Sequence, residues 1–210
     1  MKIILDLCGG TGSWSKPYAD AGYDVINVTL PVYNVKMVKF ISHELILESY
    51  DWGMSRSVPI ENVYGVLAAP PCTMFSIART TAKEPRDLKK GMEIVRACMD
   101  IIWTVHPHFW AMENPVGILR QFIGKPTMTF QPYMFGDRYM KRTDLWGYFN
   151  EPKKCIASLS DEQLLLMKDN NREMPQLPED YILPEGENKY AARRAMTPQG
   201  FAQAFFKANP

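Results

Sequence analysis

The chain has 210 residues, which corresponds to one domain with at most a small appendage. Hydrophobic residues make up 46% and charged residues 22%, a balance typical of a globular domain, and the formal net charge of +1 excludes neither a nucleic-acid nor a small-molecule partner. No apolar run approaches the roughly 20 residues that span a bilayer, and the N-terminus has no signal-peptide pattern, so we expect no membrane association.

The cysteine pattern excludes two further classes of protein. The chain contains four cysteines, Cys8, Cys72, Cys98 and Cys155, which are widely spaced and form no CxxC pair. Such spacing argues against a zinc site and against a disulfide scaffold. We therefore expect no bound metal and a reducing, cytoplasmic compartment.

The first elements in chain order enclose a glycine-rich loop. Ile3 to Leu7 predicts a short strand, residues 15–21 a short helix ended by Gly22, and Tyr23 to Leu30 a second strand. Between strand and helix stands "DLCGGTGSW", whose glycines let the backbone turn tightly and approach a ligand. The spacing lacks the third glycine of the dinucleotide fingerprint and the Gly-Lys-Ser/Thr of the P-loop. The first loop of adenosylmethionine-dependent methyltransferases and a purely structural glycine turn remain as alternatives.

The next elements alternate between strand and helix. Val63 to Ala69 predicts a buried strand, and apolar residues recurring every three or four positions predict a helix from about Asp87 to Val105, ended by Pro107. "HFWAMEN" predicts another strand, "GILRQFI" a short helix, and "MTFQPYMF" and "TDLWGYFN" two later strands. This alternation predicts an α/β fold with a largely parallel sheet and helices on both faces. Ligands of such sheets bind at the carboxyl ends of the strands.

The composition changes after Gly147. "SLSDEQLLLMKDNN" predicts a helix that begins near Ser160, and the proline-rich and acidic residues that follow predict an irregular excursion. The chain closes with "TPQGFAQAFF", which predicts a helix with Thr197 as N-cap and Pro198 at its first position.

Cys72 and Glu113 are the candidate reactive groups. Pro70 and Pro71 fix the backbone before Cys72, which follows the end of a predicted strand. Glu113 ends a second apolar strand, where a carboxylate is costly unless it has a partner or a function. A thiol and a carboxyl group at neighbouring strand ends suit covalent catalysis, whereas a buried, inert cysteine is the structural alternative.

The order of "DLCGGTGSW", "PPCTMFS", "ENPVG" and "FGDRYMKRTDLW" resembles the DNA (cytosine-5-)-methyltransferases, in particular the small forms of bacteriophages and prophages. The resemblance covers most of residues 1–149 and the C-terminal segment. It implies a Rossmann-like methyltransferase fold. Residues 1–149 would form the adenosylmethionine-dependent catalytic core, residues 150–193 a short irregular insert in place of a target-recognition domain, and residues 194–210 a C-terminal helix that returns to the core.

The resemblance also implies a mechanism and its residues. Cys72 would attack C6 of cytosine, Glu113 would hold or protonate N3, and C5 would take the methyl group of S-adenosylmethionine. The family's Gln-x-Arg-x-Arg segment appears here as "YMKRTDLW", so Arg142 or Lys141 replaces its arginines, and Arg142 is the catalytic candidate.

Further residues are assigned to ligands by the same resemblance. The implied cofactor site consists of Asp6, Cys8, Gly9, Gly10, Gly12, Trp14 and Pro70. Trp14 would lie against the adenine, with a core position as its alternative. The implied contacts to DNA and the target base are Pro71, Ser76, Arg79, Asn114, Arg138 and Lys141. A helix cap is the alternative for Ser76, and a solvated surface cluster is the alternative for the basic residues.

The expected substrate is a cytosine flipped out of duplex DNA. Two alternatives remain open. The chain has little sequence to recognise a long target, which also suits methylation of a free cytidine nucleotide or of RNA. A degenerate methyltransferase that only binds cofactor or DNA is the third possibility, against which the presence of both Cys72 and Glu113 argues.

Overall fold

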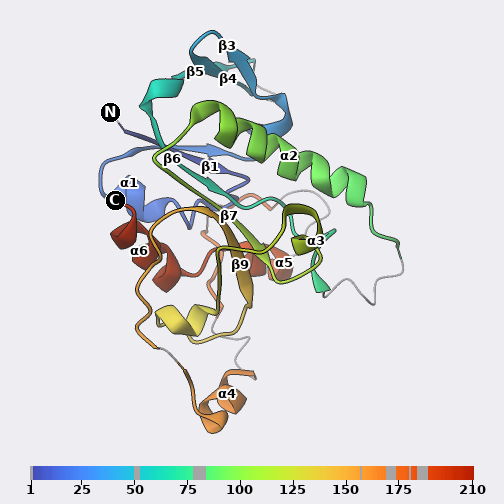
Figure 1. Cartoon of the computed structure of the whole chain (residues 1–210), viewed down its shortest axis with the longest axis vertical. Coiled ribbons are helices and arrows are strands. Elements are labelled where there is room, and N and C mark those ends of the chain that lie inside the picture. The colour runs from blue at the N-terminus through green and yellow to red at the C-terminus, as the bar shows by residue number, and fades with distance from the viewer. Residues whose placement is uncertain are drawn as a thin grey trace.

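The computed structural model describes residues 2–49, 53–77, 84–156, 158–168, 174–179, 181–183 and 189–210, and it centres on a six-stranded sheet with strand order β2-β1-β6-β7-β9-β8 (Figure 1). The strands are β1 (Ile3–Leu7), β2 (Asp24–Val28), β6 (Val63–Ala68), β7 (Phe109–Pro115), β8 (Met128–Phe130) and β9 (Thr143–Tyr148). β1 pairs in parallel with β2 and β6, and β6 pairs in parallel with β7. β9 runs antiparallel to both β7 and β8. The predicted α/β fold with a largely parallel sheet is confirmed.

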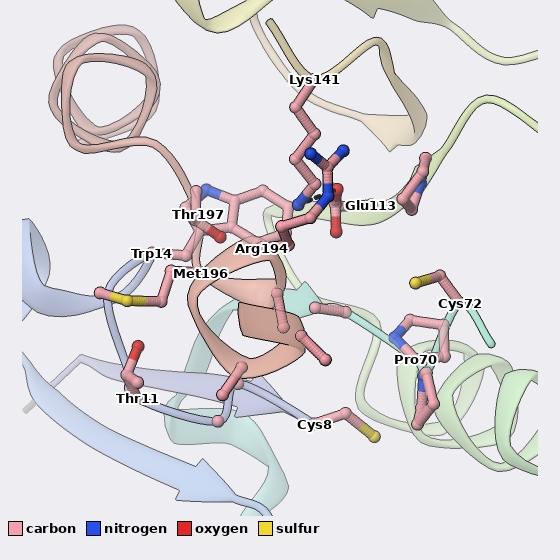
Figure 2. A pocket seen from close by; sticks show the side chains of 18 of the residues that line it. Cys8, Thr11, Trp14, Pro70, Cys72, Glu113, Lys141, Arg194, Met196 and Thr197 are labelled. Atoms are coloured by element: carbon pink, nitrogen blue, oxygen red, sulfur yellow. Dashed lines mark ion pairs between the residues drawn. The ribbon is translucent and has the colours of Figure 1, made fainter. Parts of the chain in front are cut away.

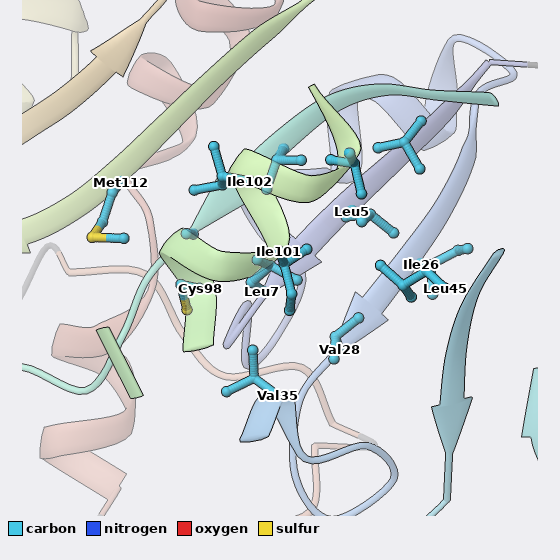
Figure 3. Packing of buried hydrophobic residues seen from close by; sticks show 14 of the residues in the cluster. Leu5, Leu7, Ile26, Val28, Val35, Leu45, Cys98, Ile101, Ile102 and Met112 are labelled. Atoms are coloured by element: carbon cyan, nitrogen blue, oxygen red, sulfur yellow. The ribbon is translucent and has the colours of Figure 1, made fainter. Parts of the chain in front are cut away.

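Side chains of β1 alternate between two apolar clusters, one on each face of the sheet. Leu5 and Leu7 belong to the cluster that includes helix α2 (Leu88–Val105), as Figure 3 shows. Ile4 belongs to the other cluster, with Tyr18 of helix α1 (Lys16–Asp20) and Phe201 of helix α6 (Gln199–Ala208). Successive strand residues point to opposite faces, so helices on both faces bury the whole strand.

Helix α2 has the predicted length and ends. The Asp87 side chain caps it by accepting a hydrogen bond of 2.9 Å from the Lys90 backbone N–H. His106, at φ 48°, ends it in the left-handed conformation before Pro107. A buried stripe including Val95 and Ile102 packs on the sheet. The helical spacing of apolar residues therefore identified this element correctly.

The cap of α6 is one residue later than predicted. Pro198 is the N-cap, in an extended conformation, and α6 begins at Gln199, so the assignment of Thr197 as N-cap is wrong. Thr197 is buried, and its backbone N–H donates to Ser13 Oγ at 3.0 Å. That contact ties the segment before α6 to the glycine-rich loop instead of capping the helix.

The strand predicted over "MTFQPYMF" is shorter than expected. β8 ends at Phe130, and Pro132–Phe135 form the 3₁₀ helix η4, because Pro132 has no N–H to continue a strand ladder. The predicted short helix before it is α3 (Arg120–Ile123).

A second, three-stranded antiparallel sheet was not predicted. Its order is β3-β4-β5, from β3 (Lys39–Ile41), β4 (Glu44–Glu48) and β5 (Ser55–Pro59). The 3₁₀ helices η1 (Val35–Met37) and η2 (Ile60–Asn62) flank it. The buried side chains Leu45 and Leu47 join the cluster around α2. Only the short alternation "ELILE" indicated this sheet, because β3 is exposed along its whole length.

The segment between β9 and α6 contains two helices. α4 (Asp161–Lys168) begins where predicted, with Ser160 Oγ accepting from the Gln163 N–H at 3.3 Å, and Figure 1 shows it projecting away from the sheet. α5 (Lys189–Ala195), which was not predicted, spans the position where the insert was expected to end. Within the described residues, no helix is both long and apolar enough to cross a membrane.

Gly200 provides a test of the packing of α6. A Cβ at this position would lie 2.1 Å from the carbonyl oxygen of Phe135 in η4. Helix propensity alone predicts that Gly200→Ala stabilises the protein by up to about 1 kcal/mol. We expect the opposite, a loss of about 1–3 kcal/mol in the free energy of unfolding, because α6 must move away from η4.

Urea denaturation measures this difference. Gln203→Ala, at an exposed position of the same helix, is the matched control and should change stability by less than about 0.5 kcal/mol. A stabilised Gly200→Ala protein would contradict the close approach of α6 to η4.

Candidate active site

The three predicted motifs meet at one cavity of about 590 Å³ beyond the carboxyl ends of β1, β6 and β7 (Figure 2). Most of the predicted site residues line it: Asp6, Cys8, Gly9, Gly10, Trp14, Pro70, Pro71, Cys72, Ser76, Glu113 and Lys141. Gly12, Asn114, Arg138 and Arg142 are not among the lining residues, and Arg79 lies outside the described residues. The parallel sheet therefore brings together side chains that are far apart in the chain.

The glycine loop keeps its backbone open to the cavity. Gly10 and Gly12 have φ values of 55° and 68°, in the left-handed region that glycine adopts without strain. A Cβ at Gly9 would lie 2.3 Å from the Asp6 carboxyl carbon, so only glycine fits there. Asn27 of β2 donates from Nδ2 to the Gly10 carbonyl at 2.9 Å and holds the loop. Gly12 shapes the turn into α1 instead of lining the cavity.

Asp6 is a buried carboxylate at the base of this loop. Its Oδ2 accepts a hydrogen bond of 2.5 Å from Ser15 Oγ, whereas its Oδ1 has no hydrogen-bond partner. Burial raises the pKa of Asp6 to about 6, although the hydrogen bonds from Ser15 oppose the rise. An unpaired carboxylate oxygen beside the cavity suits a ligand that carries a positive charge or N–H and O–H donors.

The Cys72 loop is held by hydrogen bonds from both sides. Asn114 donates from Nδ2 to the Pro70 carbonyl at 2.9 Å, which ties the end of β7 to the loop after β6. Beyond the cysteine, the Cys72 carbonyl accepts from the backbone N–H groups of Phe75 and Ser76 at 2.9 and 2.8 Å. Asn114 was assigned to the substrate, but its side-chain N–H supports the loop from behind the cavity.

The environment of the Cys72 thiol works against ionisation in the resting state. Burial and the neighbouring Glu113 carboxylate raise the pKa of Cys72, while the positive charges of Lys141 and Arg194 lower it. The thiol is half-buried and faces the cavity. Its ionisation therefore depends on the charge of Glu113 and on the two cations.

Glu113 and Lys141 form a buried ion pair. Glu113 Oε1 lies 3.2 Å from Lys141 Nζ, and both side chains are less than a tenth exposed. Oε1 is outside hydrogen-bond geometry, so the contact is mainly electrostatic. A buried carboxylate with a cation on one side keeps its remaining lone pairs available to a ligand in the cavity.

The structure distinguishes the two candidates, Lys141 and Arg142, by their position relative to Glu113. Lys141 lies against Glu113, whereas the neighbouring Arg142 side chain is exposed and outside the cavity. Consecutive residues of an extended segment point to opposite sides, so only one of the two can face Glu113. Arg138 is also exposed, on the surface outside the cavity. These positions remove Arg142 and Arg138 from the immediate surroundings of Cys72.

Trp14 and Ser76 have structural roles as well as cavity positions. Trp14 is 1% exposed and packs edge-to-face on Phe205, with ring centroids 5.5 Å apart, which favours the core alternative for its ring. Ser76 forms an isolated antiparallel bridge with Gly117 after β7. Cys8 contacts the buried Cys98, and a hydrogen bond with Cys8, together with burial, raises the pKa of the Cys98 thiol.

The C-terminal segment forms a wall of the cavity that sequence reasoning missed. Its lining residues are Tyr190, Ala191, Ala192, Arg194, Ala195, Met196 and Thr197, with Thr11, Ala69, Pro115 and Tyr181 from elsewhere. α5 has one buried residue, Ala192, and so lacks the apolar stripe that signals a packed helix. Arg193 anchors α5 by donating to the carbonyls of Pro175 and Met174 at 2.8 and 2.7 Å.

Asp6→Asn tests whether the buried carboxylate costs stability. A raised pKa means that the folded state is stabilised by protonation, so this contribution is full below about pH 4 and is lost as the pH rises through about 6. Asp6→Asn should therefore raise the free energy of unfolding by about 1–3 kcal/mol at pH 8 and change it little at pH 4.

Urea denaturation at pH 4, 6 and 8 gives the comparison. Asp20→Asn, which removes an exposed carboxylate paired with Lys16, is the control and should change little at any of these pH values. If Asp6→Asn destabilised the protein at pH 8, the carboxylate would be a structural element and not a group kept for a ligand.

Lys141→Met tests the ion pair and the finding that Lys141, and not Arg142, lies against Glu113. Removal of the cation leaves the Glu113 carboxylate buried and unpaired, so we expect a loss of about 2–4 kcal/mol in the free energy of unfolding at pH 8. The double variant Glu113→Gln/Lys141→Met should lose much less, because no buried charge remains. Arg142→Met should change stability by less than about 0.5 kcal/mol. Equal effects of Lys141→Met and Arg142→Met, measured by the same denaturation, would refute the assignment.

Comparison with known proteins shows the family of the chain. No family model matches the chain. The chain is 30% identical over 177 residues to the "Probable DNA (cytosine-5)-methyltransferase" of Frog virus 3 (isolate Goorha), an alignment that covers 75% of this chain and 76% of the viral protein.

Two solved structures are also similar. The prophage-encoded E. coli protein assigned as a DNA modification methyltransferase has a TM-score of 0.46 at 13% identity, over 79% of this chain and 54% of that protein. The S. pombe Dnmt2 methyltransferase has a TM-score of 0.36 at 12% identity, over 90% of this chain and 62% of that protein. The chain thus spans less than two thirds of either solved protein. On the identity and coverage of its viral relative, this chain belongs to the DNA (cytosine-5)-methyltransferases.

Proposed function

We propose that this chain transfers a methyl group from S-adenosylmethionine to C5 of cytosine in DNA, through a covalent bond between Cys72 and C6 of the base. The observation that carries the proposal is the cavity shared by the Cys72 thiol, the Glu113 carboxyl group and the glycine loop after Asp6. A nucleophile and a proton donor that face one cavity can activate a pyrimidine ring that is otherwise unreactive. Family membership supports DNA as the substrate.

The glycine loop fits the cofactor that the family implies. Asp6 leaves Oδ1 without a hydrogen-bond partner, and Gly9 leaves the backbone accessible where a side chain would not fit. S-adenosylmethionine supplies a methyl group carried on a positively charged sulfur, which a carbon nucleophile accepts. We assign Asp6, Cys8, Gly9, Gly10 and Thr11 to its polar groups. Pro70 and the edge of Trp14 offer apolar surface.

In the proposed reaction, Cys72 attacks C6 as a thiolate. The new S–C6 bond moves the electron pair of the C5–C6 double bond toward C5, which becomes the carbon nucleophile. Glu113 donates a proton to N3, so that negative charge does not accumulate on the ring. After methylation, the proton on C5 leaves to solvent, and the electron pair of the C5–H bond re-forms the C5–C6 double bond and expels Cys72 as a thiolate. N3 returns its proton to Glu113.

The charge of Glu113 couples the protonation states of the two reactive groups. The Glu113 carboxylate raises the pKa of Cys72, so a protonated Glu113 no longer opposes ionisation of the thiol. Donation to N3 requires Glu113 in this same protonated form. The state that can protonate the base is therefore also the state that favours the nucleophile.

The DNA must deliver a single base to this cavity, because N3, C5 and C6 must all be reached. The acidic side chains at the start of α4, Asp161 and Glu162, oppose a phosphate-lined groove. We therefore propose a short target sequence that is read mainly near the cavity, with the exposed Arg138 and Arg142 contacting phosphates at its rim.

The chemistry requires a reducing compartment. Cys8, Cys72, Cys98 and Cys155 are all free thiols. Cys72 acts only as a thiol or thiolate, and oxidation would abolish its nucleophilicity. We propose that the enzyme works in a reducing cytoplasm, which for a phage-encoded protein is that of the host.

The direct test is methyl transfer from labelled S-adenosylmethionine. We expect duplex DNA to be labelled and its digest to contain 5-methylcytosine. Cys72→Ser should lower kcat by at least about 10³-fold, because a hydroxyl group is far less acidic than a thiol. It should leave the affinity for S-adenosylmethionine, measured by calorimetry, within about threefold. Wild-type protein should form a covalent adduct with DNA containing 5-fluorocytosine, which cannot lose a proton from C5.

The controls separate the rival functions. Cys155→Ser removes an exposed thiol outside the cavity and should keep full activity. Single-stranded DNA, tRNA and dCMP are tested beside the duplex, and exclusive labelling of tRNA or dCMP would move the substrate away from DNA. Full activity of Cys72→Ser would disprove the covalent mechanism, and cofactor binding without 5-methylcytosine in any substrate would indicate a degenerate enzyme.

A further inference from the structure

Arg194 places a second cation beside the reactive groups. It lies on α5 and lines the same cavity as Cys72, Glu113 and Lys141. Figure 2 shows its side chain pointing toward Glu113 and Lys141, with Cys72 apart from this group. The side chain is half-buried. The C-terminal segment therefore contributes a charged group to the site and not only a wall.

Within the described part of the chain, the Arg194 guanidinium has no hydrogen-bond or carboxylate partner. Its contact is the ring of Tyr190, whose centroid lies 5.9 Å from Arg194 Cζ. Two neighbouring cations have partners. Lys141 in the same cavity pairs with Glu113, and Arg193 on the same helix donates to two backbone carbonyls. A guanidinium carries five N–H donors in a planar fork, which suits a phosphate or a carboxylate.

The charge balance of the cavity also favours an anionic ligand at this end. The positive charge of Arg194 reaches the nucleophile, since it lowers the pKa of Cys72, and it also lowers that of the buried Tyr139. In the reacting state proposed above, Glu113 is neutral and Cys72 is a thiolate. Lys141 balances the thiolate, so the charge of Arg194 remains without a counterion at this end of the cavity.

The position of the target base decides which anion this is. Cytosine must lie with C6 against Cys72 and N3 toward Glu113, and its sugar is attached to N1, next to C6. The phosphates on either side of that sugar lie several bonds from the ring, so a long side chain that lines the cavity can reach one of them.

We propose that Arg194 binds a phosphate adjacent to the target cytosine, so that helix α5 supplies the contact which holds the flipped nucleotide against Cys72. This inference rests on the proposed function. It makes a nucleotide, and not a bare nucleoside, the substrate of the cavity. It also gives the residues after the insert a direct role in substrate binding.

A cycle that combines a protein variant with a phosphate substitution tests the contact. The substrate is a duplex that contains one methylated site, found beforehand by bisulfite sequencing of a methylated plasmid. One phosphate beside the target cytosine, on its 5′ or 3′ side, is replaced by an uncharged methylphosphonate. Wild-type protein and Arg194→Gln are compared on both duplexes by kcat/KM and by fluorescence anisotropy.

We expect Arg194→Gln to lose about 10-fold or more in kcat/KM on ordinary DNA, the size of a lost charge-assisted contact. Wild-type protein should lose a similar factor on one of the methylphosphonate duplexes, and Arg194→Gln should lose almost nothing further on it. Arg194→Lys, which keeps the charge, should recover part of the loss. Lys189→Gln, which removes an exposed charge from the same helix, should behave as wild type on both duplexes.

Other outcomes overturn the inference. If Arg194→Gln and each methylphosphonate lowered kcat/KM independently, so that the combined loss equalled the product of the two factors, Arg194 would not contact a neighbouring phosphate. A drop of 10-fold or more in the affinity of Arg194→Gln for S-adenosylmethionine, measured without DNA, would assign Arg194 to the cofactor. Absence of methylation by the wild-type protein would refute the proposed function instead, and the anisotropy cycle, run on a duplex that contains one unpaired cytosine, would still judge the phosphate contact.

Discussion

A carboxylate buried at the end of β7 imposes a requirement on its surroundings. Removing an ionised group from water costs several kcal/mol unless a counter-charge lies next to it, on the order of the penalties known for buried ions. Lys141 supplies that charge at 3.2 Å from Glu113. The antiparallel register of β9 pairs Pro115 with Thr143, so the residues just before β9 run beside the end of β7. The insertion of β9 between β7 and β8 is what delivers the cation.

The neighbour of Glu113 fixes the second half of the site. Adjacent strand residues point to opposite sides, so Glu113 faces the cavity while Asn114 faces the loop after β6. The Asn114 side chain donates a hydrogen bond to the Pro70 carbonyl and thereby fixes the position of the Cys72 loop relative to Glu113. The two proline rings restrict the same backbone. One dipeptide at the end of β7 thus supplies the carboxyl group and holds the loop that carries Cys72.

The sequence predicted the elements whose signals are local. The strands β1, β6 and β7 were evident because both faces are buried and their residues are continuously apolar, and α2 was evident from its stripe and its caps. The motifs at the strand ends then followed from the carboxyl-end rule. The sheet β3-β4-β5 had only the short alternation of β4 as a signal, and helix α5 had none, because exposed β3 and alanine-rich α5 obtain their positions from tertiary contacts.

The choices within the site depended on geometry that no motif encodes. Whether Lys141 or Arg142 faces Glu113 is decided by the register of β9, which the letters "MKRT" do not contain. Whether the Trp14 ring faces the cavity or the core is decided by α6, whose Phe205 packs against the ring. Arg194 could be recognised only after α5 was folded against the three motifs. Each of these residues carries its role through a partner distant in the chain.

The distribution of charge along the cavity gives the site a direction. Asp6, at the glycine loop, has an unpaired carboxylate oxygen and no cation among the described residues within ion-pair distance. Lys141 and Arg194 lie away from that loop, beside Glu113, which is already paired with Lys141 (Figure 2). A positively charged methyl donor is attracted toward the first end and repelled by the second, whereas a phosphate experiences the reverse. In the proposed reaction, this polarity favours the methyl donor and the phosphate in opposite halves of one cavity.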